Sequence, residues 1–389
     1  MKSPFRELLE AGWTAELIGF SALDRYFNIP PGPVTFVKTT ADLPELSRLF
    51  ENLRFPGAII ADAAADLGEH RYYFYCAENH NSPVFEHSLL NVAFDQGRQV
   101  FIDNAGLYPV LKEMAKAFFN PEQRTVNNIP WLDINANSPK QRDIGPYLVL
   151  ETAVMLSRYS ALESPYYFHD PVTDLLKKVV LQAEPQKLPA EMERTYLELL
   201  LTSNRPDLGF SLLMGTGLMA LLWPELAMMD RTDHSKEFHP EGNVWRHTLE
   251  TFRHRKKADL LLSLGLLLHD SGKSLAESSG GRRFDRHAEL GADLAKKFLE
   301  RLGYSESTIG KVQYLVRNHM MPAALPRLPL QRTQETLESP LFPTLLELYR
   351  CDEASSFKGL DNYYESAAAY QNYLRNVKNP YRRADGKKL

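Results

Sequence analysis

Residues 260–273 read LLLSLGLLLHDSGK, and this stretch decides how the C-terminal third of the chain is interpreted. A run of leucine this dense predicts a buried helix, yet it ends in His269 and Asp270. Burying an imidazole beside a carboxylate is unfavourable unless both groups have partners, and a divalent metal ion would satisfy both. Gly272 allows the helix to end there, and Lys273 places a cation beside whatever binds.

Side chains of the same chemistry lie on other predicted helices before and after this stretch. Adjacent residues of one helix diverge by about 100°, so one His-Asp pair cannot form a cage and several helices must converge. A lone pair of this kind is more often a helix end or a surface pair, but here five predicted helices each supply a candidate. The candidate metal ligands are His247, His269, Asp270, His287, His319 and Asp352.

Four imidazoles and two carboxylates form a mixed nitrogen and oxygen ligand set. Such a set suits Mn, Fe, Co, Ni or Zn, with Mg possible at the oxygen-rich end. Six ligands are enough for two ions about 3.5–4 Å apart and bridged by Asp270. The sequence therefore predicts a centre of one or two divalent ions, and the number of ions stays open.

The N-terminal third shows a different pattern, with short β-rich runs separated by polar and Gly/Asn breaks. We expect strands near 34–37, 57–60, 71–76, 89–94 and 100–103, paired mainly as hairpins, with helices near 3–13 and 42–53. Beyond about residue 105 the apolar spacing is helical, interrupted by a long connection at 125–146. The predicted fold class is α+β and mostly α.

Composition narrows the class of protein. The 45 basic and 49 acidic residues give a formal net charge of −4, which excludes a strongly basic nucleic-acid coat but not a local basic patch. Two cysteines far apart in sequence exclude a disulfide framework. The N-terminus has no secretory pattern and no apolar stretch is long enough to span a membrane. We expect a soluble, cytoplasmic protein with no membrane partner and an unspecified oligomeric state.

The H-D-x-G-K sequence at 269–273 resembles the HD superfamily of metal-dependent phosphohydrolases. HPEGNVWRH at 239–247 is similar, more narrowly, to the HD domain attached to bacterial CCA-adding and poly(A) polymerase-type tRNA nucleotidyltransferases. Residues 188–226 resemble the helical neck and body of those enzymes, and FIDNAGLYPVL at 101–111 resembles a strand of their head. The likeness extends to about residue 375.

The resemblance implies an order of domains. A nucleotidyltransferase-like head with a mixed sheet is expected at 1–125, and a helical neck and body of RNA-binding type at 126–237. An all-α HD domain is expected at 238–376, followed by a basic, flexible tail at 377–389.

The head departs from the family pattern at the positions that carry its chemistry. The family's Gly-Gly-x-x-Arg-Asp loop corresponds here to residues 19–24, GFSALD, which lack the second Gly and the Arg. The family's Asp-x-Asp corresponds to Thr35-Phe36-Val37, and neither Thr35 nor Val37 can replace a carboxylate as a magnesium ligand. Of the family's nucleotide-reading arginines, the segment 145–159 keeps only Arg158. We therefore expect a head that has lost nucleotide addition.

The resemblance also implies roles for the HD residues. His247, His269, Asp270 and Asp352 would bind metal, and His287 and His319 would complete a second metal site or position a phosphate. Asp270, Lys273 and His287 are the expected catalytic residues, with Lys273 neutralising charge on the phosphate. Arg282, Arg283 and Arg286 fit a substrate-binding segment and a solvated basic loop equally well.

These roles lead to three hypotheses about function. The first is a divalent-metal-dependent phosphohydrolase or phosphodiesterase acting on a nucleotide, a 2′,3′-cyclic phosphate or an RNA 3′ end. The second is an active tRNA nucleotidyltransferase of the CCA-adding or poly(A) polymerase type. The third is a non-catalytic regulator that binds RNA or a nucleotide and carries a structural metal. In each case the partner is a phosphate-containing molecule, with tRNA or a nucleotide as candidates.

Overall fold

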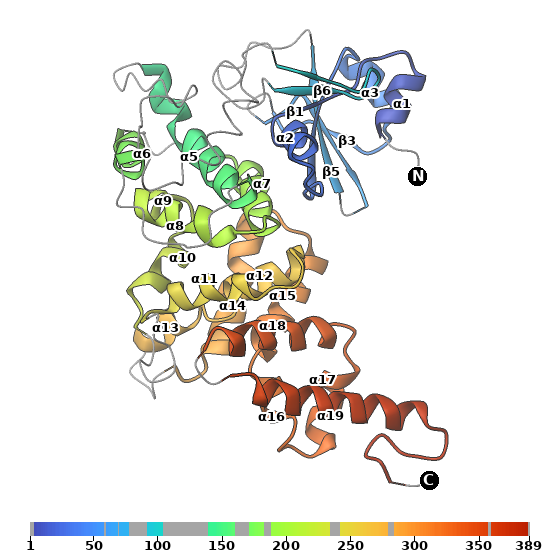
Figure 1. The fold of residues 1–389 in the computed structure, drawn as a ribbon, viewed down its shortest axis with the longest axis vertical. Coiled ribbons are helices and arrows are strands. Elements are labelled where there is room, and N and C mark those ends of the chain that lie inside the picture. Colours follow the sequence, from blue (N-terminus) through green and yellow to red (C-terminus); the bar gives the residue numbers. More distant parts are fainter. Residues whose placement is uncertain are drawn as a thin grey trace. The chain divides into compact units, whose positions relative to one another are not determined.

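The computed structural model describes residues 4–57, 60–68, 70–77, 92–103, 139–159, 171–182, 188–233, 242–278, 284–356 and 359–387. It divides the chain into two compact units, Met1–Leu222 and Trp223–Leu389. The first unit contains a mixed sheet and helices, and the second is entirely helical in its described part (Figure 1). The predicted α+β, mostly α fold class is confirmed.

Within the described residues the sheet has seven strands in the order β3-β4-β5-β2-β1-β6-β7. Among the described strands, only β2 and β5 pair in parallel, with Val34 opposite Arg71 and Thr39 opposite Cys76. Hairpins do join β4 to β5 and β6 to β7, although β4 begins at Ala63 and not within the predicted strand 57–60. The hairpin expectation is wrong for β2–β5, because α3 (Leu43–Leu49), β3 and β4 intervene between these two neighbours. The strand bounds are β1 Glu16–Ile18, β2 Val34–Thr39, β3 Leu53–Arg54, β4 Ala63–Leu67, β5 His70–Cys76, β6 Ala93–Asp95 and β7 Val100–Ile102.

The two faces of the sheet are covered by different parts of the first unit. Because side chains alternate along a strand, Val37 and Phe74 share one face, where they pack with Leu8 of α1 (Pro4–Glu10) and Leu46 of α3 (Leu43–Leu49). On the opposite face, the Tyr73 hydroxyl lies 2.8 Å from Glu191 Oε1 and 2.9 Å from Thr195 Oγ1, both on α7 (Ala190–Leu201).

A buried ion pair joins the sheet region to the helical part of the same unit. Arg158, on α5 (Pro139–Tyr159), donates two hydrogen bonds of 2.7 Å to the carboxylate of Asp24, on α2 (Phe20–Phe27). Tyr159 adds a third, 2.8 Å long, to the same carboxylate. The remaining helices among the described residues of this unit are α6 Pro171–Gln182, α8 Pro206–Thr216 and α9 Leu218–Leu222.

The start of α5 corrects one sequence expectation. Residues 139–146 belong to this helix, whereas the predicted connection extends to 146. The Asn- and Pro-rich composition misleads here because Pro146 lies inside the helix, a position that proline seldom occupies since its ring removes a helical hydrogen bond. Residues 109–119, a predicted helix, lie outside the described residues, as do 89–91 and 58–59 of two predicted strands.

The second unit surrounds one central helix, α12 (Leu260–Leu268). Leu264, Leu266, Leu267 and Leu268 are fully buried, and α12 contacts α11, α15 and α18. A leucine-rich helix buried on all sides is what the sequence predicts for this stretch. The other helices of the unit are α10 Pro224–Ala227, η3 Met228–Arg231, α11 Val244–Arg253, α13 Lys273–Ser278, α14 His287–Arg301, α15 Glu306–Asn318, α16 Met321–Ala324, α17 Leu330–Glu338, α18 Phe342–Ala354 and α19 Asp361–Lys378.

The chain beyond α19 turns back in its described part. Arg383 N donates to Lys387 O at 2.8 Å, and Asn376 Nδ2 of α19 lies 3.4 Å from Ala384 O. No helix among the described residues is long and apolar enough to cross a membrane.

Candidate metal centre

The candidate centre is built around the end of α12. Asp259 caps the start of this helix by accepting a 2.8 Å hydrogen bond from Leu262 N. The apolar run then buries the other end, so that His269 is fully buried and Asp270 is 2% exposed. His269 Nδ1 lies 2.8 Å from Leu266 O. Since a carbonyl oxygen only accepts, Nδ1 carries the proton and Nε2 keeps its lone pair.

His269 Nε2 has no hydrogen-bond partner among the described residues, although it is buried. A buried polar atom without a partner is unusual in a folded protein. A histidine that donates Nδ1 to a carbonyl and leaves Nε2 open is arranged as metal-binding histidines are. This atom therefore fits a metal ligand better than it fits a structural role.

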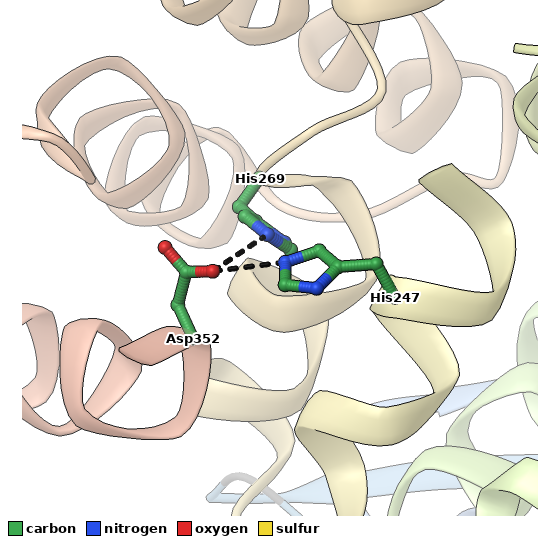
Figure 2. Close-up of side chains that lie close together, drawn as sticks. All are labelled: His247, His269 and Asp352. Atoms are coloured by element: carbon green, nitrogen blue, oxygen red, sulfur yellow. Dashed lines mark hydrogen bonds and ion pairs between the residues drawn. The ribbon is translucent and has the colours of Figure 1, made fainter. Parts of the chain in front are cut away.

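One group of ligands combines His247, His269 and Asp352, from α11, α12 and α18 (Figure 2). Asp352 Oδ1 lies 2.9 Å from His247 Nε2 and 3.9 Å from His269 Nε2. One ligand atom from each residue lies within 4.8 Å of the others, which is close enough to hold one metal ion. Ser355 Oγ lies 3.3 Å from His247 Nδ1 and orients this ring.

A second group combines Asp270, His287 and His319. Asp270 Oδ1 lies 3.7 Å from His287 Nε2 and 3.8 Å from His319 Nε2. The two Nε2 atoms are 3.2 Å apart, and each Nδ1 meets a carbonyl three residues earlier, that of Phe284 or Val316. The structure thus brings all six predicted ligands together, in two groups of three.

Asp270 faces both groups. Its Oδ1 is directed toward His287 and His319, while its Oδ2 lies 3.4 Å from His269 Nε2 and 3.9 Å from His247 Nε2. A carboxylate that presents one oxygen to each group can bridge two ions. Within the described residues these are the two groups of three or more His, Cys, Asp or Glu able to hold a metal ion.

The environment favours the metal-binding forms of His319, His287 and Asp352. Burial lowers the pKa of His319 to about 4 against the opposing attraction of Asp270, and burial likewise lowers the pKa of His287. Burial by itself would raise the pKa of Asp352, but the hydrogen bond from His247 and its charge hold that pKa well below the usual range. At neutral pH both imidazoles are neutral and Asp352 is ionised, as metal coordination requires.

Lys273 lies next to this centre, at the start of α13. Its Nζ is 2.6 Å from Asp270 Oδ2 and 5.4 Å from the centre of the Phe284 ring. Arg286 precedes α14 with a left-handed backbone, φ 57°. Arg282 and Arg283, grouped with it in the sequence analysis, lie outside the described residues.

The head does not fit a catalytic metal on β2. Val37 is fully buried in the core. The Thr35 hydroxyl lies 2.7 Å from His70 Nε2, at the start of β5. Asp24, the last residue of the altered glycine loop, accepts a hydrogen bond from Arg158 and is paired with it. None of the metal-binding groups found among the described residues lies in the head.

Eight residues that line the cavity beside the metal-ligating cluster were missed from the sequence: Phe284, Met320, Ala323, Arg327, Tyr349, Glu353, Ser356 and Asn362. Tyr349 precedes Asp352 by three residues and Glu353 by four, so helical spacing from a proposed ligand could have indicated this side of α18. No sequence signal points to Arg327 or Asn362.

Comparison with known proteins supports the HD assignment. Residues 243–344 match the HD domain family. Over 161 residues the chain is 36% identical to the CC-adding tRNA nucleotidyltransferase of Thermus thermophilus, a match that covers 39% of this chain and 36% of that protein. Over 159 residues it is 26% identical to the Multifunctional CCA protein of Shewanella denitrificans, covering 40% and 38%. The chain thus matches well under half the length of these relatives.

A solved structure of a tRNA nucleotidyltransferase complexed with a primer tRNA and an incoming ATP analogue can be aligned with this chain. The alignment covers 96% of this chain and 99% of the chain in that structure. The identity is 14% and the TM-score 0.48.

These relatives correct the expected function. One is named a CC-adding tRNA nucleotidyltransferase and the other a Multifunctional CCA protein, and neither name states a phosphohydrolase, so the phosphohydrolase hypothesis is wrong. It failed because a metal-binding fold does not by itself specify the reaction of the protein that carries it. The resemblance itself is confirmed as a likeness: residues 243–344 match the HD domain family, and the chain is similar over 161 residues to a CC-adding tRNA nucleotidyltransferase.

Proposed function

We propose that this chain is a tRNA nucleotidyltransferase of the CCA-adding type, with the 3′ end of tRNA and a nucleoside triphosphate as its substrates. The observation that carries this proposal is the 36% identity over 161 residues with a CC-adding enzyme. We further propose that the HD domain holds one or two divalent ions through the two groups of ligands around Asp270. The buried, unpartnered Nε2 of His269 supports this metal assignment.

The head limits how transfer could take place. Nucleotidyl transfer commonly uses metal ions that activate the attacking hydroxyl and stabilise the leaving phosphate. Thr35 and Val37 give β2 no carboxylate for such an ion. Nearby carboxylates are engaged elsewhere: Asp66 lies 3.3 Å from Arg71 Nε, and Asp62 accepts a 2.8 Å hydrogen bond from Cys76 N. Neither β2 nor these two carboxylates therefore offer a place for a catalytic metal ion in the described part of the head.

A second candidate is favoured by this same departure. With Val37 in the core and Thr35 bonded to His70, the head could bind tRNA or a nucleotide without transferring anything. The protein would then be a binding member of the family, with its metal in the HD domain. Both candidates share tRNA as the partner and differ only in whether a nucleotide is incorporated.

The test is incorporation of radiolabelled CTP and ATP into tRNA transcripts that end before the CCA sequence, after C or after CC. The full chain would be assayed with Mg²⁺ or Mn²⁺, beside a mock preparation from cells that lack the expression plasmid. Transfer above the mock level supports the first candidate, and the accepted transcript identifies the nucleotide added. Retention of tRNA in a gel-shift assay without incorporation supports the second. If the protein neither incorporates a nucleotide nor retains tRNA, both candidates are refuted.

A further inference from the structure

One carboxylate oxygen of the metal-ligating cluster has neighbours of two kinds. Asp270 Oδ2 lies 3.4 Å from His269 Nε2 and 3.9 Å from His247 Nε2, which with Asp352 form one of the two groups of candidate ligands. The same oxygen lies 2.6 Å from Lys273 Nζ, an ammonium that can only donate hydrogen bonds. Asp270 Oδ2 therefore faces both a group of metal ligands and a cation that the chain itself supplies.

The ion pair between Lys273 and Asp270 is local and largely buried. Lys273 is the first residue of α13 and follows Asp270 by three positions, and its backbone N donates to Asp270 O at 3.0 Å. Backbone and side chain thus close the same turn. The two side chains are 11% and 3% exposed, so solvent screens the pair much less than it screens a surface pair. Short contacts of this kind are typical of charge-assisted hydrogen bonds.

A metal ion that takes Asp270 Oδ2 as a ligand would meet this ammonium. Two cations at one oxygen repel each other, and the repulsion is strong where little solvent screens it. With neither cation present, the charge of the buried carboxylate would be uncompensated, which is also unfavourable. Asp270 Oδ2 is therefore best satisfied by one cation, either the ammonium or the metal ion.

The structure provides a second position for the ammonium close by. Lys273 Nζ lies 5.4 Å from the centre of the Phe284 ring, within the distance at which an aromatic face attracts a cation. Both side chains line the same cavity, of about 370 Å³. The lysine side chain has a flexible four-carbon stem, so the ammonium can leave Asp270 and remain beside Phe284 without unpacking the core.

We propose that Lys273 is a built-in competitor of the metal ion. It pairs with Asp270 Oδ2 in the metal-free protein, and it moves toward Phe284 when an ion binds to the ligand group that contains His247 and His269. Lys273 thereby stabilises the second unit without metal and lowers its affinity for metal. This inference rests on the metal assignment of the proposed function, and it is separate from the contact with phosphate expected of Lys273 from the sequence.

The test is calorimetric titration of the full chain with Mn²⁺, comparing the wild type with Lys273→Met. The variant is expected to bind Mn²⁺ about 10- to 100-fold more tightly, the equivalent of one hydrogen bond between charged groups that no longer has to be broken. Without metal it should unfold at a lower temperature than the wild type, and Mn²⁺ should raise its unfolding temperature by more. A lysine that only positions Asp270 as a ligand would give the opposite result, weaker binding by Lys273→Met.

Two further substitutions at the same position separate charge from packing. Lys273→Arg keeps a cation and should bind Mn²⁺ about as the wild type does. Lys273→Gln is neutral but can still donate a hydrogen bond to Asp270, so it should bind more tightly than the wild type. Lys273→Gln also provides the comparison if Lys273→Met does not fold.

Lys296→Met is the matched control. It removes a lysine of α14 whose Nζ lies 3.6 Å from Glu300 Oε1, in an exposed pair of the same unit, and Lys296 is not among the described residues that line the cavity. This variant should bind Mn²⁺ like the wild type. In an Asp270→Asn background, Lys273→Met should no longer increase the affinity. A gain that persists there would show a general effect of charge and would refute competition for this oxygen.

The outcomes separate this role from the proposed function. Mn²⁺ binding by the wild type that Lys273→Met leaves unchanged or weakens would refute this role alone. If neither the wild type nor any variant binds Mn²⁺, Ni²⁺ or Zn²⁺, the metal assignment is refuted and this role with it. Nucleotide incorporation is measured independently, so its loss with the expected gain in metal affinity would refute nucleotide addition and leave the role of Lys273 supported.

Discussion

His269, His287 and His319 share one hydrogen-bonding pattern. Each ring donates through Nδ1 to the carbonyl three residues earlier, at 2.7–2.9 Å. Two of them end a helix and the third begins one, which is where such a carbonyl is within reach of the side chain. The pattern fixes the tautomer and directs the three Nε2 atoms toward Asp270. Three independent helices therefore prepare ligands of the same kind for one carboxylate.

We expect His269→Ala to lower the affinity for Mn²⁺, Ni²⁺ or Zn²⁺ at least about 100-fold, since even an outer hydrogen-bond partner of a ligand is worth 10- to 100-fold. Metal content after dialysis and calorimetric titration would measure this loss. His254→Ala is the matched control, because His254 lies outside both groups and near Glu250 Oε1, at 3.7 Å. Equal metal binding by His269→Ala and the control would contradict the assignment.

The stability of the metal-free protein should depend on pH through His319. Its folded pKa of about 4 is below the value of about 6.5 expected in the unfolded chain. The unfolded state therefore binds more protons between these values, so this contribution to stability is complete above pH 6.5 and is lost as the pH falls toward 4. Urea unfolding of wild type and His319→Gln between pH 4 and 7.5 would measure it. If the free energy of unfolding of the variant changes with pH as that of the wild type does, His319 is not the cause of the pH dependence.

At the scale of elements, Gly272 brings three helices close together. A Cβ at this position would lie 2.0 Å from His287 O and 2.4 Å from Gly291 N. Both are backbone atoms of α14 and cannot move aside as a flexible side chain does. This close approach keeps His269 and Asp270, at the end of α12, beside His287, at the start of α14. The glycine of the H-D-x-G-K sequence is thus required by packing as well as by the helix end.

We expect Gly272→Ala to destabilise the second unit by about 3 kcal/mol or more, at the upper end of overpacking effects, and to weaken metal binding. Gly310→Ala on α15 is the matched control, because its Cβ would meet nothing within 4 Å. There the substitution should be neutral or stabilising by up to about 1 kcal/mol. Denaturant unfolding would compare the two variants. Equal stabilities would show that the backbone of α14 moves away from a Cβ at position 272 at little cost in free energy.

For the whole molecule, the two units have separate cores and different stabilising devices. The first contains the buried Arg158–Asp24 pair, with side chains 2% and 7% exposed. The second contains the metal-ligating cluster. Removing one partner of a buried pair costs about 3–5 kcal/mol, and a ligand at 100 times its Kd stabilises the unit that binds it by about 2.7 kcal/mol.

Calorimetry should therefore resolve two thermal transitions that respond to different changes. Mn²⁺ should raise only the transition of the second unit, and Arg158→Met should lower only that of the first. Arg48→Met, which replaces an exposed arginine of the first unit, should leave both transitions in place. A single transition that shifts with both Mn²⁺ and Arg158→Met would show that the units unfold together.

The sequence by itself determined the fold class, the central helix of the second unit and the residue types of the candidate site. Helical spacing and the leucines of 260–268 predict a buried helix, because periodicity depends only on residues close in the chain. The six candidate metal ligands and the absence of carboxylates at Thr35 and Val37 could likewise be read from residue types and from the family resemblance. The reaction could not be read from the sequence, because the same set of ligands serves different reactions.

Only the tertiary structure decided how these residues meet. His247 and Asp352 are 105 positions apart, yet lie 2.9 Å from one another, and Asp270 presents a different oxygen to each group of ligands. The parallel pairing of β2 with β5, the Arg158–Asp24 pair and the cavity beside Tyr349 likewise escaped sequence reasoning. Each depends on distances between elements remote in the chain, and packing of the whole domain sets those distances while local sequence patterns do not.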